Sequence, residues 1–144
     1  MKQLIVMLLS SVVTGIVVCN YTPQNHSEVL AIASPLATIA GILFGFVIAS
    51  SSLFTSISKN VLIENLKNHQ GMYRELMEQL HRTGMWLISS CIFMVVSIFS
   101  PDKELYFSFK WDHVILMAGF WFMICGLIDF WDSWRKVRLV VVHL

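Results

Sequence analysis

Two aspartates near the end of the last apolar run are the residues best placed for chemistry in a membrane. Asp129 and Asp132 lie three residues apart, which puts both side chains on one side of a helix. Carboxylates at a membrane span often bind ions or transfer protons. Lys136 follows Asp132 by four residues and can neutralise it through an i,i+4 pair. We therefore interpret the aspartates as an ordinary charged helix end, with an ion role as the alternative.

The other residues that could bind metal or act as nucleophiles are scattered along the chain. The five histidines have no metal-ligand spacing to cysteine or carboxylate neighbours: His26, His69, His81, His113 and His143. Three cysteines form no disulfide framework. Neither a GxSxG motif nor a phosphate-binding glycine loop is present. We expect a protein that is not an enzyme and uses no metal or cofactor.

The composition excludes most soluble classes of protein. Of the 144 residues, 56% are hydrophobic and only 13% are charged. The mean hydropathy is +0.70. A soluble domain usually carries about 25% charged residues. The net charge of +1 provides no basic field that could bind nucleic acid. These values are typical of an integral membrane protein.

Four apolar runs have lengths close to the roughly 20 residues that cross a bilayer as a helix. They cover residues 4–21, 30–51, 84–100 and 113–131. The first run lacks a following small-x-small cleavage site, so we interpret it as a span and not as a signal peptide. The sequence therefore predicts an all-α membrane protein in which residues 1–144 form a single four-span domain.

The distribution of basic residues predicts the orientation. With the amino terminus in the cytoplasm, eight basic residues lie inside: Lys2, Lys59, Lys67, Arg74, Arg82, Arg135, Lys136 and Arg138. Only Lys103 and Lys110 then lie outside. Cytoplasmic loops carry such an excess of Lys and Arg. We expect a multi-pass protein of the inner (plasma) membrane with both termini and residues 53–83 in the cytoplasm.

Small residues recur every four positions in the second span, where they include a GxxxG motif. They are Ala33, Ala37, Gly41, Gly45 and Ala49. In the fourth span, Gly119 and Gly126 lie seven residues apart on one face. Small residues let helices approach closely in lipid. The pattern indicates helix packing, either within the monomer or between subunits of a homo-oligomer.

The long segment between the second and third spans carries apolar residues at helical spacing. They are Ile57, Val61, Leu62, Leu66, Tyr73, Leu76 and Leu80. We expect a helix continuing from the second span, a break near Gln70, and an amphipathic helix leading into the third span. This segment would rest on the membrane surface or bind a cytoplasmic protein partner.

A basic group follows the fourth span. Arg135, Lys136 and Arg138 are predicted to anchor this span to anionic lipid of the bilayer. The pattern of residues 139–144 predicts no structure or function.

The stretch from Gly41 to Leu80 carries a resemblance to a family. It contains Gly-Ile-Leu-Phe-Gly-Phe at residues 41–46, Asn60 with Leu-Ile-Glu-Asn-Leu at 62–66, and Gly-Met-Tyr-Arg-Glu-Leu at 71–76. This resembles small multi-spanning bacterial membrane proteins of anti-phage defence systems, of the retron or cyclic-nucleotide-signalling effector type. The four-span plan is also similar to the membrane subunit of the Kiwa system. The resemblance implies an inner-membrane location, a role in defence and a cytoplasmic partner.

Two classes of function therefore stay open. The first is an oligomeric defence protein, either a membrane-disrupting effector or the membrane subunit of a defence complex. The alternative is a small channel or holin-like pore unrelated to immunity, which needs only oligomeric geometry and a few polar side chains.

Overall fold

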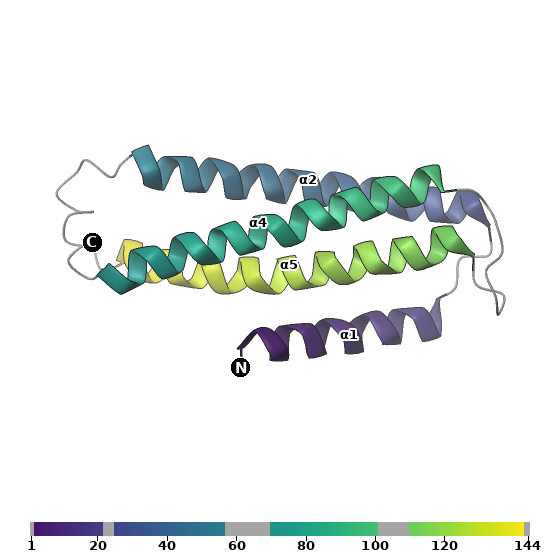
Figure 1. Ribbon diagram of the computed structural model, residues 1–144, viewed down its shortest axis with the longest axis horizontal. Coiled ribbons are helices and arrows are strands. Elements are labelled where there is room, and N and C mark those ends of the chain that lie inside the picture. The colour runs from purple at the N-terminus through teal and green to yellow at the C-terminus, as the bar shows by residue number, and fades with distance from the viewer. Residues whose placement is uncertain (1, 22–24, 57–69, 101–109, 143–144) are drawn as a thin grey trace.

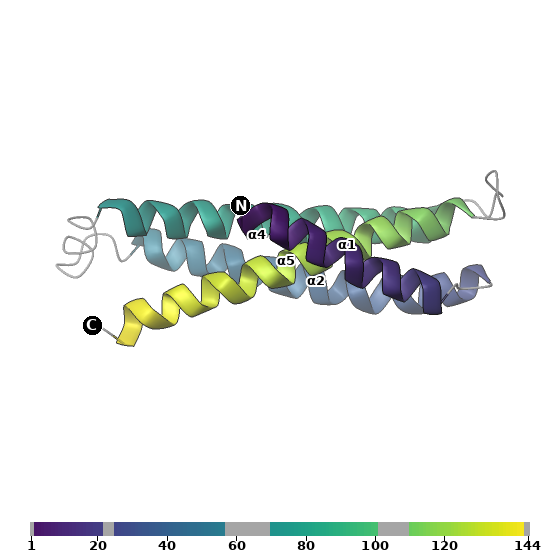
Figure 2. The same cartoon turned by 90° about the horizontal axis from the view of Figure 1, so that it is seen from below.

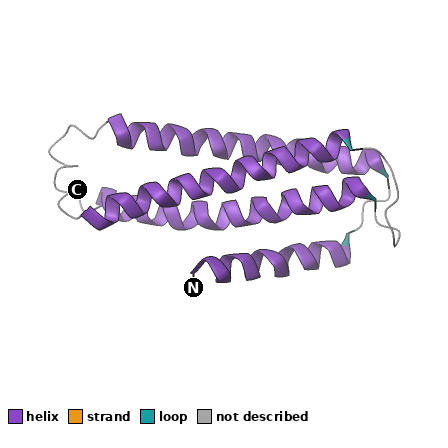
Figure 3. Cartoon of the chain, in the orientation of Figure 1, coloured by secondary structure: helices purple, strands orange, loops and turns teal. Residues whose placement is uncertain are grey.

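In the residues that it describes, the structure, a computed structural model, contains four long helices (Figures 1 and 3). It describes residues 2–21, 25–56, 70–100 and 110–142. The helices are α1 (Lys2–Asn20), α2 (His26–Ser56), α4 (Gln70–Phe99) and α5 (Trp111–Val142). All four are long and apolar enough to cross a membrane. The predicted all-α four-helix membrane protein is confirmed.

Three of the helices are longer than a bilayer requires. With a rise of about 1.5 Å per residue, the 19 residues of α1 measure about 28 Å, close to the thickness of the hydrocarbon core. The 30 to 32 residues of α2, α4 and α5 measure about 45–48 Å. These three therefore extend beyond the hydrocarbon. We call the end where α2 ends, α4 begins and α5 ends the C-terminal end of the bundle.

The helices follow each other in space in the order α2, α4, α5 and α1 (Figures 1 and 2). The most extensive packing joins α4 to α5, and α4 also packs along α2. α1 packs against α5 alone among the described helices. Two side-chain hydrogen bonds mark this contact. The Cys125 thiol donates to Ser10 Oγ at 3.1 Å, and the Trp121 indole N–H donates to Ser11 Oγ at 3.1 Å.

Glycines of α5 allow the close approach of α4. A Cβ at Gly126 would lie 2.9 Å from Leu87 Cδ2, and one at Gly119 would lie 3.2 Å from the backbone nitrogen of Met94. Ser90 donates a hydrogen bond to the carbonyl of Gly119 at 2.8 Å. Gly119 and Gly126 therefore pack inside the monomer.

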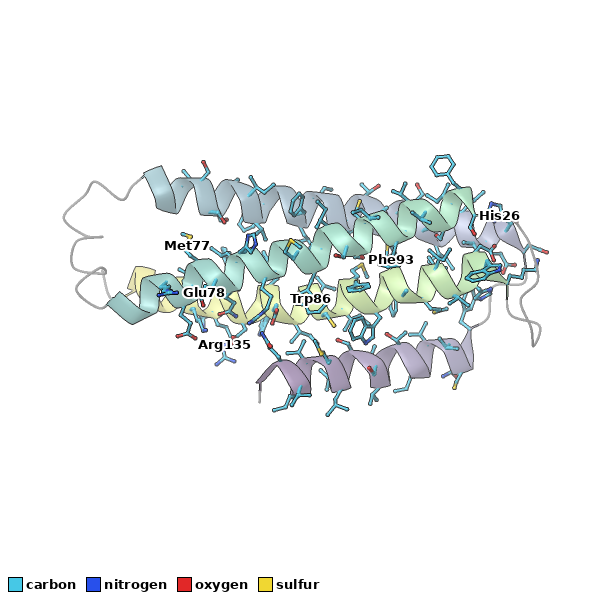
Figure 4. The ribbon with its side chains drawn as sticks, viewed as in Figure 1. His26, Met77, Glu78, Trp86, Phe93 and Arg135 are labelled. Carbon is cyan, nitrogen blue, oxygen red and sulfur yellow. The ribbon has the colours of Figure 1, made fainter. Side chains whose placement is uncertain are left out.

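Aromatic rings of α4 and α5 pack together beside the contact of the two helices. The rings of Phe93 and Phe122 stack with centroids 5.1 Å apart. Trp86 meets Phe122 at 5.6 Å and Trp121 at 6.0 Å. The labelled Trp86 and Phe93 lie along α4 in Figure 4. Such offset and edge-on pairs add to the burial of apolar area.

The part of residues 53–83 that the structure describes does not form a separate surface helix. α2 continues to Ser56, and α4 begins at Gln70 and runs into the third span as one helix, in line with the predicted helix leading into that span. Leu76 and Leu80 are 2% and 4% exposed and belong to a core cluster that also contains Val47. Their prediction as surface or partner contacts is therefore wrong, because α2 packs along this part of α4 and covers both side chains.

The side chains of the other predicted contact residues of that segment are not among those that the structure describes. Ile57, Val61, Leu62 and Leu66 lie outside the described residues, as does the side chain of Tyr73. At the end of the chain, α5 continues to Val142, so most of residues 139–144 extends the last helix.

Burial within the chain is low. In the most apolar 18-residue stretch of α1, only 6% is buried inside the chain. In the corresponding stretches of α4 and α5, the buried share is 33%. Large side chains such as Leu4, Ile42 and Phe99 are at least 65% exposed. An apolar surface of this extent is stable when lipid covers it.

The α4–α5 contact yields a first prediction. We expect Gly119→Ala to lower the free energy of unfolding by about 1–3 kcal/mol, since a backbone atom cannot move aside as a flexible side chain can. The measurement is unfolding of the purified protein in mixed micelles. Gly15→Ala is the matched control, because a Cβ there meets nothing within 4 Å. Equal stability of the two variants would contradict the close packing.

Candidate functional site

A partly buried ion pair links α4 to α5 near the C-terminal end of the bundle. Asp129 is only 5% exposed. Arg82 donates to both of its carboxylate oxygens, from Nε at 2.8 Å and from Nη2 at 3.3 Å. This fork geometry is the strongest arrangement of a guanidinium and a carboxylate. The Ser133 hydroxyl donates to the backbone carbonyl of Asp129 at 2.9 Å.

The second aspartate belongs to the same network. Gln79 donates from Nε2 to Asp132 at 2.8 Å and accepts from Lys136 Nζ at 2.6 Å. Lys136 also lies 2.7 Å from Glu75 Oε1. The predicted pair between Lys136 and Asp132 measures 3.9 Å, longer than the bonds that Lys136 makes to α4.

This geometry corrects one predicted role. Lys136 was expected to anchor the helix to lipid beside Arg135 and Arg138, but its ammonium group turns inward onto α4. Arg135 and Arg138 are exposed. The difference has a simple cause, because Lys136 lies one turn after Asp132 and so shares its side of the helix.

The network favours the structural interpretation of Asp129 and Asp132. Both carboxylates have partners from α4, which fix the register of the two helices. The described ranges hold no group of three or more His, Cys, Asp or Glu residues that could bind a metal ion. Sequence reasoning missed Gln79 and Arg82. The signal was present, because these two residues lie three apart on α4 just as the aspartates do on α5.

The four-residue repeat of α2 does not lie on one side of the helix. Each step of four residues turns the chain by about 400°, so the stripe drifts by about 40° per step. Ala33 is fully buried, Ala37 is half-buried, and Gly41, Gly45 and Ala49 are exposed. The predicted single packing stripe is thus divided between the core and the outer surface.

A different set of small residues forms a straight exposed face on α2. We call it the small face, and its members are Ser27, Ala31, Ser34, Thr38, Gly41, Gly45, Ala49 and Ser52. Their steps of three and four residues average close to the 3.6 of a helical turn. All eight are exposed. The buried residues of α2 lie toward the other side: Val29, Ala33, Ala40 and Val47.

The small face is open within the chain. A Cβ added at Gly41 or at Gly45 would meet nothing within 4 Å. The Thr38 hydroxyl donates to the carbonyl of Ser34 at 2.9 Å, so this polar group is satisfied inside its own helix. The face therefore offers a smooth surface on which another helix backbone can lie close.

A second polar cluster lies at the opposite end of the bundle, between the first turns of α2 and α5. His26 Nδ1 lies 3.1 Å from Asp112 Oδ2, and the His113 backbone N–H donates to Asp112 Oδ1 at 2.9 Å. Asp112 is fully buried. The spacing of His26 and His113 predicts no metal site. The fold brings His26 to Asp112 across 86 residues, a pairing without a linear signal. His26 marks this end in Figure 4.

Comparison with known proteins places none of these features in a described family. Neither the family models, nor the curated proteins, nor the solved structures give a match to this chain.

The ion pair yields a second prediction. Asp129→Asn and Arg82→Gln should each lower the free energy of unfolding by roughly 2–5 kcal/mol, because each leaves a partner charge unpaired in the bundle. The double variant should lose less than the sum. A double-mutant cycle of unfolding in mixed micelles measures this coupling.

The matched control is the pair Arg74–Glu78, whose side chains are 83% and 67% exposed. Its removal should change stability by less than about 0.5 kcal/mol. Strictly additive losses at Arg82 and Asp129 would show that the two groups do not stabilise each other.

Proposed function

We propose that this chain is a non-enzymatic membrane protein that works as a homo-oligomer joined through the small face of α2. The observation that carries the proposal is the exposure of that face on the side of α2 away from the core. Interfaces between helices in lipid are rich in small residues, because burial of apolar area provides little driving force there.

The surrounding surface supports the choice of α2. The exposed residues of α1 are mostly large and apolar, with Leu4, Leu8 and Val12 each at least 59% exposed. Such side chains pack well against lipid chains but hold neighbouring backbones apart. On the small face, Gly41 and Gly45 let a second α2 approach at backbone distance. The partner in this proposal is a second copy of the chain.

The proposed role is anti-phage defence at the bacterial inner membrane. The protein would act as a membrane-disrupting effector or as the membrane subunit of a defence complex. This part of the proposal depends on the resemblance of residues 41–80. The positive-inside pattern supports an orientation with both termini in the cytoplasm. In the described ranges, basic side chains gather toward the C-terminal end, with Arg82 and Arg138 among them, whereas Lys110 lies at the opposite end.

A cytoplasmic protein partner for residues 53–83 belongs to the same proposal. Because Leu76 and Leu80 are buried inside the chain, such a contact would use other residues of the segment. Arg74 and Glu78 offer one exposed charged surface there. Figure 4 shows Glu78 near the C-terminal end of the bundle.

A small channel or holin-like pore unrelated to immunity is the second candidate. The hydroxyl groups of Ser34, Thr38 and Ser52 favour it, because they give the small face polar atoms that could line a water-filled path between copies. An effector should be harmful only when triggered or freed from its regulator, whereas a constitutive channel should conduct ions in liposomes without any trigger.

The test of the proposal is the double variant Gly41→Leu/Gly45→Leu. We expect it to reach the membrane and fold, since both positions are exposed and a Cβ added at either meets nothing within 4 Å. Two leucines would hold a second α2 away, so native mass spectrometry should show the loss of the oligomer. During induced expression in bacteria, any growth arrest and depolarisation by the wild type should disappear with it.

Gly15→Leu is the matched control, because it adds the same side chain at an equally open position on α1. It should retain the wild-type oligomer and the wild-type effect on membrane potential. A wild type that is monomeric, or a double variant that still assembles, would refute the small face as the interface. Assembly without any effect on growth would favour the membrane subunit over the autonomous effector.

A further inference from the structure

The start of α1 indicates where α5 leaves the hydrocarbon core of the membrane. Ser10 meets Cys125, and the two helices run in opposite directions (Figure 1). Lys2 lies eight residues before Ser10, so α1 begins at about the level of Ser133. Because α1 is about as long as the hydrocarbon core is thick, the hydrocarbon ends near this level and α5 continues into the headgroup layer.

Four residues of α5 at this level form one exposed face. Trp131, Trp134, Arg135 and Arg138 have the spacing i, i+3, i+4 and i+7 of a single helix side. Trp131 is 67% exposed and Trp134 is 49% exposed. Figure 4 shows Arg135 on the side of α5 away from α4. We call this set the Trp-Arg face.

The acidic residues of α5 do not neutralise this face. Asp129 and Asp132 lie on the α4 side, where they are bound by Arg82 and Gln79. Lys136 turns to the same side. In the described part of the chain neither Arg135 nor Arg138 has an ion-pair partner. Two guanidinium groups therefore face the headgroup layer with their charge uncompensated.

The two tryptophans form the part of the Trp-Arg face nearer the hydrocarbon, and one of them packs against α2. The Trp134 ring lies against Phe46 of α2 with centroids 6.1 Å apart, and Phe46 also meets Phe130 at 5.8 Å. This contact limits the freedom of the Trp134 ring before anything binds. Indole rings favour the boundary between hydrocarbon and headgroups. The arginines follow one turn beyond, at the depth of lipid phosphates.

We propose that the Trp-Arg face binds the headgroup of an anionic phospholipid in the leaflet at the C-terminal end of the bundle. The guanidinium groups of Arg135 and Arg138 hold the phosphate through paired hydrogen bonds, and the indoles of Trp131 and Trp134 cover the glycerol and upper acyl region. Two unneutralised charges select a lipid with net negative charge over a zwitterionic one. This site requires no oligomer and stands apart from the small face of α2.

The experiment uses the full chain in detergent with lipid added back. Phosphatidylglycerol and phosphatidylcholine with identical acyl chains are titrated separately, and native mass spectrometry counts the bound lipids. We expect tighter binding of phosphatidylglycerol. Arg135→Gln/Arg138→Gln should reduce its affinity by about 25-fold, at about fivefold for each charge, and leave phosphatidylcholine binding nearly unchanged.

Arg74→Gln is the control, since Arg74 is an exposed basic residue of the same end that is paired with Glu78. It should bind phosphatidylglycerol as the wild type does. Circular dichroism and gel filtration verify the fold of each variant. Equal affinity of the wild type for the two lipids, or an unchanged affinity of the double variant, would overturn the proposal. So would full competition by millimolar inorganic phosphate, which would identify a site for free phosphate.

Discussion

The arrangement of the four described helices is built on the close contact of α4 with α5. Two glycines of α5 permit it, because a Cβ at Gly119 would lie 3.2 Å from the Met94 backbone nitrogen and one at Gly126 would lie 2.9 Å from Leu87 Cδ2. Burial of apolar area provides little driving force between helices in lipid, so polar contacts add to close packing in holding their axial register. The Arg82–Asp129 ion pair supplies the register, since a one-residue slip would separate two charges that are costly to leave unpaired.

The other two helices join this pair in different ways. α2 packs along α4 and shares apolar clusters at both ends of the bundle, with Val47 near one and Val29 near the other. Among the described helices, α1 contacts α5 alone, and most of its surface is left for lipid. Because α4 lies on one side of α2 and no described helix covers the other, the small face remains open. The proposed assembly is thus a consequence of the place of α2 at the edge of the bundle.

The C-terminal end of the bundle combines two kinds of charge. Charges turned toward α4 are paired and hold helices together, as with Lys136 and Glu75. Charges turned outward, on Arg135 and Arg138, are left for the solvent and the headgroups. Arg135 and Lys136 are neighbours in sequence but have different roles, because successive residues of a helix point in different directions.

The sequence alone specifies the four membrane helices, since the need for about 20 apolar residues acts on each segment locally. It also predicted the small residues of α2 and the glycines of α5 as packing positions. Only the tertiary structure decided which side of α2 is buried, that Leu76 and Leu80 lie in the core, and which residues pair with Asp129, Asp132 and Asp112. A periodic pattern states which residues share a side of a helix. The neighbour that covers this side depends on packing between segments distant in sequence, and for that reason the partner Arg82 lies 47 residues from Asp129.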